Sequence, residues 1–331
     1  MTALGAVFRP QLPPERLRAL ARLADEAGLE ELWLWEDCFL EGGISTAAAA
    51  LAWTERLRVG VGLLPVPLRN VAITAMEAAT LHRMFPGRPI LAVGHGVQDW
   101  MGQVGARAES PLTLLREHLD ALRALLSGER ITTRGRYVSL DGVALDWPPD
   151  GPVEVLTGAT GPRTLRLAGE CADGTVLTAG TSPEGVRRAR RLIDEGRQKA
   201  GRTGQPHQEA GRTGQPHQES GRTGQPHQES GRTGQPHDEA GRTEPPHRVV
   251  VYLLTATGPD ATARLHAELA QEGHADVPDL GVAGDADTVA KAVQRLADAG
   301  ADTVVLQPTA DEPNPEAFVR FTAEQVRPLL P

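Results

Sequence analysis

The feature that most constrains the fold is a regular alternation of short apolar runs with amphipathic helical segments along most of the chain. Runs of about four to eight residues that are rich in Val, Ile and Leu and bounded by turn residues are typical of buried strands. Eight such runs occur, at residues 4–9, 31–35, 57–64, 89–94, 153–158, 174–180, 247–256 and 302–308. This order predicts strands that alternate with helices.

Two of the intervening segments, 13–28 and 288–300, have the clearest helical pattern. Each places apolar residues along one face and ends at a glycine, as helices often do. Their apolar positions are Leu17, Leu20, Leu23, Ala24, Val289, Val293 and Leu296. Eight strands with helices between them predict a TIM (β/α)8 barrel, with residues 1–331 forming a single domain. The competing fold is a doubly wound open sheet, which would be favoured by a glycine-rich turn where this chain has RPQLPPE.

A decapeptide repeat interrupts this alternation at residues 201–247. Its units contain Gly, Arg, Thr, Gln, Pro, His and Glu, and they lack the apolar face that stacked repeats need. We therefore interpret the repeat as a disordered expansion of a surface loop, which costs little stability. Five of its histidines, His207, His217, His227, His237 and His247, recur every ten residues. That spacing does not bring metal ligands together locally, so we predict no metal site.

The net charge of −9 argues against a nucleic-acid partner, because phosphate binding favours a basic face. The sequence contains no apolar run of about eighteen residues and no signal-like start, so we expect neither a membrane span nor a secretory signal. These features predict a cytoplasmic protein whose partner is a small-molecule substrate.

In a TIM barrel the active site lies at the loops that follow the strands. The loop after the second strand reads WEDCF, where Glu36 and Asp37 stand beside Trp35 and Cys38. A carboxylate in such a partly apolar mouth is suited to handling a proton. The alternative is that these carboxylates cap a helix or pair with a basic residue.

Glycines mark the ends of the third and fourth strands. Gly60 and Gly62 lie inside a strand, where glycine indicates the close approach of another group, and we expect that group to be a flat ligand. The fourth strand ends in GHG, in which Gly94 and Gly96 would bring a ligand close to the backbone and His95 could form a hydrogen bond with it.

The fifth strand leads into TGATGPR at residues 157–163. Gly158 and Gly161 precede a helix that we expect to begin near Pro162 and to carry Arg163. Backbone N–H groups at a helix N-terminus form a ready anion site, so this loop is a candidate phosphate-binding element. The alternative is an ordinary glycine turn.

These motifs, taken in order, resemble those of the bacterial luciferase-like flavin and deazaflavin oxidoreductases, and most closely the branch that uses coenzyme F420. The resemblance spans nearly the whole chain apart from the repeat. Its most specific parts are PGRPILAVGHG at residues 86–96 and GPRTLRLAGECADG at residues 161–174.

The resemblance implies a barrel that holds an isoalloxazine-type ring in its mouth and the cofactor phosphate on the loop after the fifth strand. It assigns phosphate binding to Gly158, Ala159, Thr160 and Gly161, and it places Gly94 and Gly96 along the path of the cofactor. A cis peptide bond between Gly62 and Leu63 would back the ring. Members of the family are often dimers, so a homodimer is also an expectation of the resemblance.

Two departures limit what carries over. Deazaflavin dehydrogenases of the family have Asp-His after the second strand, whereas here Cys38 follows Asp37, and Val97 stands where some members have a glutamate. Sugar-phosphate dehydrogenase activity is therefore not expected. For proton transfer the sequence leaves His95, Asp37 and Glu36 as candidates, and His95 is favoured because the ordinary pKa of histidine lies nearest neutrality.

The resulting hypothesis is hydride transfer between C5 of coenzyme F420 and an unidentified organic substrate. Trp35, Phe39 and Trp100 would form an apolar wall above the ring, beside Cys38, and Arg69 would meet an anionic group of the substrate. The first alternative is an FMN-dependent monooxygenase on the same barrel. The second is a non-catalytic protein that binds a ligand and uses the repeat as an interaction arm.

Overall fold

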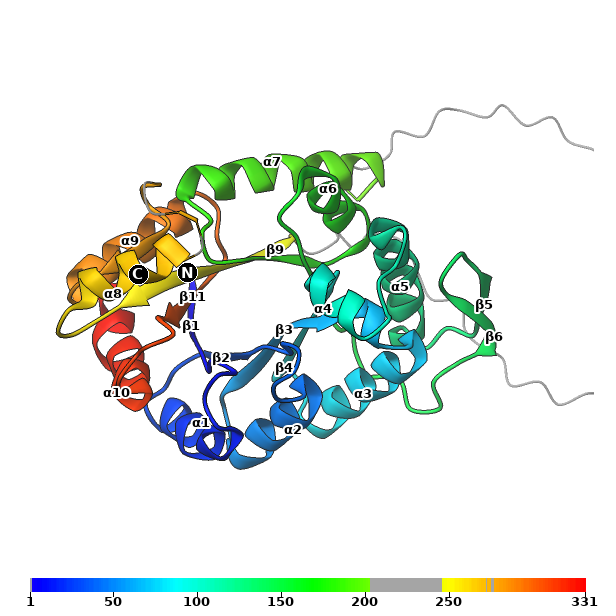
Figure 1. The fold of residues 1–331 in the computed structure, drawn as a ribbon. Coiled ribbons are helices and arrows are strands. Elements are labelled where there is room, and N and C mark those ends of the chain that lie inside the picture. Colours follow the sequence, from blue (N-terminus) through cyan, green and yellow to red (C-terminus); the bar gives the residue numbers. More distant parts are fainter. Residues whose placement is uncertain (1, 203–245, 272, 275–276) are drawn as a thin grey trace, which may run out of the picture.

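The computed structural model is a TIM barrel, as the sequence predicts, and it describes residues 2–202, 246–271, 273–274 and 277–331 (Figure 1). The barrel strands are β1 Ala3–Val7, β2 Glu31–Leu34, β3 Arg58–Pro65, β4 Pro89–Gly94, β7 Val155–Gly158, β8 Gly174–Leu177, β9 Arg248–Ala256 and β11 Thr303–Pro308. All neighbours pair in parallel, and pairing of β8 with β9, with Leu177 opposite Val251, closes the barrel.

Helices surround the strands, as Figure 1 shows. They are α1 Leu17–Glu26, α2 Gly43–Trp53, α3 Val71–Met84, α4 Gln98–Gln103, α5 Pro111–Leu126, α6 Pro162–Cys171, α7 Pro183–Lys199, α8 Ala261–Gln271, α9 Ala286–Asp298 and α10 Pro315–Arg320. The two helices predicted most clearly are present as α1 and α9. Gly28 and Gly300 follow them with φ angles of 77° and 110°, which glycine adopts without strain.

Three strands were not predicted from the sequence. β5 Ile131–Arg134 and β6 Ser139–Val143 form an antiparallel hairpin that projects beside α5 (Figure 1). β10 Gly281–Ala283 pairs in parallel with the end of β9. These strands are short, and two of them lie partly exposed on a hairpin, so they lack the long apolar runs that reveal barrel strands.

Aromatic side chains fill the interior of the barrel. Trp33 and Tyr252 are almost fully buried, and their rings meet edge to face with centroids 5.8 Å apart. A Cβ atom added to Gly60 would lie 2.5 Å from the Trp33 ring, and one added to Gly62 would lie 2.3 Å from the Tyr252 hydroxyl. The group that an added Cβ atom would meet at these two strand glycines is therefore a core aromatic side chain, and the flat ligand expected there stays a prediction.

Most of the predicted repeat insertion lies outside the described residues, but its last histidine does not. His247 is buried next to the start of β9, and its Nε2 lies 2.8 Å from the Thr175 hydroxyl. Residue 247 thus belongs to the packed barrel, and the predicted insertion extends too far at this end. Among the described residues, no helix is both long and apolar enough to cross a membrane.

Candidate active site

A cavity of about 640 Å³ opens at the carboxyl ends of the barrel strands. Its walls include eleven of the residues proposed from the sequence: Trp35, Glu36, Asp37, Gly62, Leu63, His95, Gly96, Trp100, Gly158, Ala159 and Thr160. Seven other proposed residues do not line it: Cys38, Phe39, Arg69, Gly94, Gly161, Pro162 and Arg163. These eleven residues come from the carboxyl-terminal part of β3 and from the ends of β2, β4 and β7 and the segments that follow them, so four strands contribute to one site.

The Leu63 side chain packs against the backbone of two glycines, Gly94 and Gly158. The peptide bond between Gly62 and Leu63 is cis, as the family resemblance implies, and a second cis bond, which was not predicted, joins Cys38 to Phe39. A Cβ atom on Gly94 would lie 2.6 Å from the Leu63 Cδ2 atom, and one on Gly158 would lie 2.3 Å from it. Gly94 therefore makes room for Leu63, which corrects its predicted place along the cofactor path.

The loop after β7 leads directly into the N-terminus of α6. Gly161 is the N-cap of α6, Pro162 occupies the first turn, and a Cβ atom on Gly161 would meet nothing within 4 Å. The backbone N–H of Ala159 already donates to the Val176 carbonyl at 3.2 Å, so it is taken up within the barrel. The turn that begins at Thr160, which lines the cavity, leads into α6, where the helix dipole favours negative charge.

His95 is held against the first turn of α6. Its Nε2 atom lies 3.1 Å from the Thr164 hydroxyl. Burial lowers the pKa of the imidazole below its ordinary value, so the ring is neutral near pH 7.

Asp37 has the opposite shift. Burial raises the pKa of its carboxyl group, although the positive charge of Arg9 works against this effect. The nearby Glu41 carboxyl also has a raised pKa, first because of burial and in smaller part because of the negative charge of Asp37. Asp37 lines the cavity, so its carboxyl group retains a proton more readily than an exposed aspartate does.

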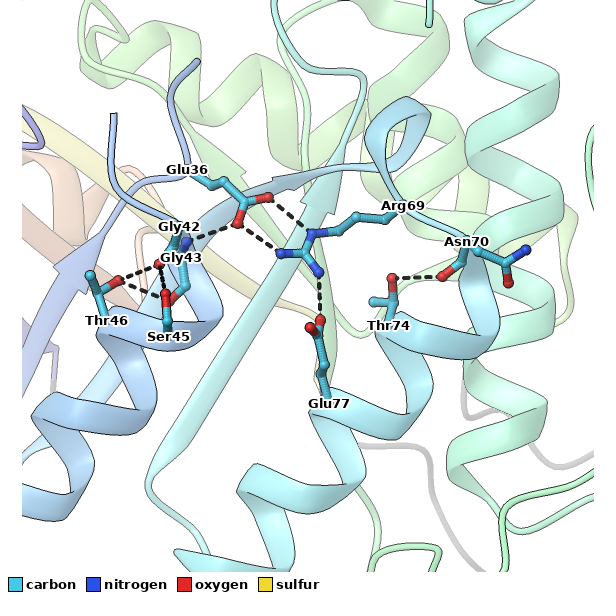
Figure 2. Close-up of polar contacts among 9 residues, drawn as sticks. All are labelled: Glu36, Gly42, Gly43, Ser45, Thr46, Arg69, Asn70, Thr74 and Glu77. Atoms are coloured by element: carbon cyan, nitrogen blue, oxygen red, sulfur yellow. Dashed lines mark hydrogen bonds and ion pairs between the residues drawn. The ribbon is translucent and has the colours of Figure 1, made fainter. Parts of the chain in front are cut away.

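Glu36 and Arg69 are engaged with each other (Figure 2). The Arg69 guanidinium donates two hydrogen bonds to the Glu36 carboxylate, at 2.9 and 2.8 Å, and a third to Glu77 at 2.5 Å. Glu36 also accepts a hydrogen bond from the backbone N–H of Gly43, at the start of α2. The prediction that Arg69 meets a substrate anion is therefore wrong, because two carboxylates hold its guanidinium outside the cavity. Of the two interpretations of Glu36, pairing with a basic residue is the one observed.

The predicted aromatic wall is present in part. Trp35 and Trp100 line the cavity, whereas Phe39 is 65% exposed and lies outside it. The Trp35 ring lies 5.8 Å from that of Tyr252.

Sequence reasoning missed several residues of the wall. Arg9 follows β1, Tyr252 lies in β9 and Gln307 lies near the end of β11. Functional residues of TIM barrels lie at the carboxyl ends of the strands, and this rule could have identified Arg9 and Gln307. His274 comes from the segment after α8, which contains no recognisable motif. The Arg9 guanidinium donates to Glu268 at 2.7 Å and lies 5.7 Å from the Trp35 ring.

Comparisons with known proteins agree with this architecture. The 5,10-methylenetetrahydromethanopterin reductase of Methanolobus tindarius is 32% identical over 198 residues, which cover 60% of this chain and 60% of the reductase. The F420-dependent glucose-6-phosphate dehydrogenase of Microbacterium testaceum is 32% identical over 208 residues, covering 58% of this chain and 61% of that enzyme. The aligned part thus spans about three fifths of each relative.

Among solved structures, an F420-dependent secondary alcohol dehydrogenase in complex with an F420–acetone adduct superposes with a TM-score of 0.77 and 20% identity. The superposition covers 100% of this chain and 99% of that one, which supports the fold. Residues 3–303 match the profile of the Luciferase-like monooxygenase family. The barrel and this match lead to the same conclusion: the chain belongs to the luciferase-like monooxygenase family.

Proposed function

We propose that this protein is an oxidoreductase that transfers a hydride between coenzyme F420 and a small organic substrate. The observation that carries the proposal is the cavity of about 640 Å³ at the barrel mouth, whose walls combine apolar surface, the start of the turn that leads into α6 and the half-buried carboxyl group of Asp37. Cofactor sites have this size and composition. The names of the relatives above point to the same cofactor.

The residues present fit a deazaflavin. Leu63 offers an apolar surface to a flat ring, and the turn from Thr160 to the start of α6 suits its phosphate. When bound, the deazaflavin would supply the hydride chemistry, while the barrel orients it and excludes water.

For the proton that accompanies hydride transfer we propose Asp37 in place of His95, which the sequence favours. Asp37 lines the cavity and burial raises the pKa of its carboxyl group, whereas burial lowers the pKa of His95 and the Thr164 hydroxyl lies within hydrogen-bond distance of its Nε2 atom. Glu36 is assigned a structural role, because Arg69 and the α2 N-terminus hold its carboxylate.

Two alternative functions can be distinguished from this proposal by experiment. An FMN-dependent monooxygenase agrees with the name of the family, and a non-catalytic binder would use the cavity without turnover. A homodimer and a cytoplasmic location stay predictions from the sequence.

The test is a titration of the purified protein with F420 and, separately, with FMN, followed by fluorescence. We expect F420 to bind at micromolar concentration and much more tightly than FMN. In a Gly158→Asp variant binding should be lost, because a side chain there collides with Leu63 and its charge repels the phosphate. Gly151→Asp, in the exposed segment before β7 where an added Cβ atom would meet nothing within 4 Å, is the matched control and should bind F420 normally. Preference for FMN would move the protein to the monooxygenase alternative, and binding of neither would favour the non-catalytic one.

A further inference from the structure

The part of the cavity away from the proposed cofactor residues has a distinct charge pattern. It is formed by Arg9 and Gln11 after β1, by Trp35 after β2, by Gln307 on β11 and by His274. Among the described residues that line the cavity, Arg9 is the only arginine or lysine. An anionic group of a substrate would therefore have to use Arg9 as its counter-ion.

Arg9 already has an internal counter-ion. Its Nη1 atom donates to the Glu268 carboxylate at 2.7 Å and to the Pro308 carbonyl at 2.8 Å, and its Nε atom donates to Gln11 at 3.3 Å. The two charged side chains are only 12% and 10% exposed. The pair is thus largely withdrawn from water. Because water and salt screen buried charges only weakly, the attraction between the two side chains is strong.

Glu268 is fixed from a second side. It lies on α8, and its other carboxylate oxygen accepts a hydrogen bond from the backbone N–H of Ala310 at 2.6 Å, beyond the end of β11. Glu268 therefore does not need to move to reach Arg9, and it does not itself line the cavity. Its carboxylate is held in place by hydrogen bonds from Arg9 and from the backbone N–H of Ala310.

The consequence is a substrate site without net positive charge. Glu268 cancels the charge of Arg9, and the cavity also contains Asp37, whose carboxyl group is either neutral or negative. An anion that enters a poorly hydrated site without a free counter-ion loses more hydration than it regains, so it is rejected.

We propose that Glu268 is a specificity-determining residue that occupies the anion position beside Arg9 and restricts the site to uncharged substrates, such as neutral ketones and alcohols. This inference rests on the proposed function, because it assumes that the substrate reacts in the same cavity as the cofactor. Replacement of Glu268 by glutamine keeps the shape of the side chain and removes the charge, and it should convert Arg9 into an anion site.

The test uses protein saturated with F420 and two matched probes, cyclohexanol and trans-4-hydroxycyclohexanecarboxylate. Binding is followed by tryptophan fluorescence, since Trp35 lies 5.7 Å from Arg9. The wild-type protein should bind the alcohol at least about tenfold more tightly than the carboxylate. Glu268→Gln should gain about tenfold in affinity for the carboxylate and change little toward the alcohol.

Two further variants serve as controls. Glu312→Gln breaks a similarly buried ion pair, with Arg264 at 3.0 Å, which lies outside the cavity and should leave the binding of both probes unchanged. The double variant Arg9→Gln, Glu268→Gln should lose the gained affinity.

A Glu268→Gln protein that binds F420 normally but gains nothing toward the carboxylate would overturn the inference. If this variant fails to fold, preference of the wild-type protein for the carboxylate would overturn it equally. Failure of the wild-type protein to bind F420 would instead contradict the proposed function.

Discussion

The sequence and the structure assign different roles to Glu36. The sequence makes Glu36 a candidate for proton transfer, whereas the structure shows its carboxylate bound by Arg69 and by the backbone N–H of Gly43. We therefore expect Glu36→Ala to destabilise the barrel, because it removes the contact that ties the loop after β2 to the loop after β3 and to the start of α2.

The size of this effect follows from the burial of the pair. The side chains of Glu36 and Arg69 are 14% and 16% exposed, and removal of one partner of such a pair typically costs about 3–5 kcal/mol. Glu77 remains beside Arg69 and offsets part of the loss, so we expect a value near the lower limit, about 3 kcal/mol. Glu77 is more exposed and makes a single contact with Arg69, so Glu77→Ala should cost only about 1–2 kcal/mol.

Urea unfolding followed by tryptophan fluorescence measures both variants against the wild-type protein. The account predicts a clearly lower unfolding free energy for Glu36→Ala than for Glu77→Ala. A Glu36→Ala protein with wild-type stability and no turnover would refute the reasoning, because Glu36 would then act in the chemistry.

Three further predictions follow from the core and the cavity. Gly158→Ala should lower the unfolding free energy by about 1–3 kcal/mol through its collision with Leu63, and Leu63→Ala in the same chain should restore much of it in urea unfolding. Burial lowers the pKa of His118 to about 4 and that of His247 to about 3, so the unfolded chain takes up protons first as the pH falls below about 6.5. The unfolding free energy should then decrease by up to about 2.7 kcal/mol per pH unit because of these two groups. Urea unfolding at a series of pH values between 7 and 4.5 measures this decrease, and an unfolding free energy that does not change with pH would contradict the burial of these histidines as neutral rings. Burial raises the pKa of Asp37, so its charged form destabilises the fold; Asp37→Asn should be more stable than the wild-type protein at pH 7, and the gain should vanish below about pH 4, where both states are protonated.

The barrel was predictable because its determinants are local. Strand runs such as 89–94 and helices such as α1 carry their periodicity and their end signals in consecutive residues. The cavity could be located for a similar reason, since the rule about strand ends applies to any strand that has been found. Trp35, Asp37 and His95 were identified in this way, and they do line the cavity.

The roles of individual side chains were less predictable, because they depend on partners far along the chain. Arg69 pairs with a residue 33 positions away, and Arg9 pairs with one 259 positions away. No local pattern indicates such contacts. The glycines show the same limit: Gly60 and Gly94 were correctly read as sites of close approach, but the approaching groups are Trp33 and Leu63, which only the closed barrel brings to them.

The central claim is that the barrel mouth holds a deazaflavin, and a crystal structure of the protein grown with F420 tests it most directly. The account predicts the ring in the cavity beside Leu63, with the phosphate at the turn between Thr160 and the first turn of α6. F420 bound elsewhere on the barrel, or a cavity left without F420 at saturating concentration, would contradict it.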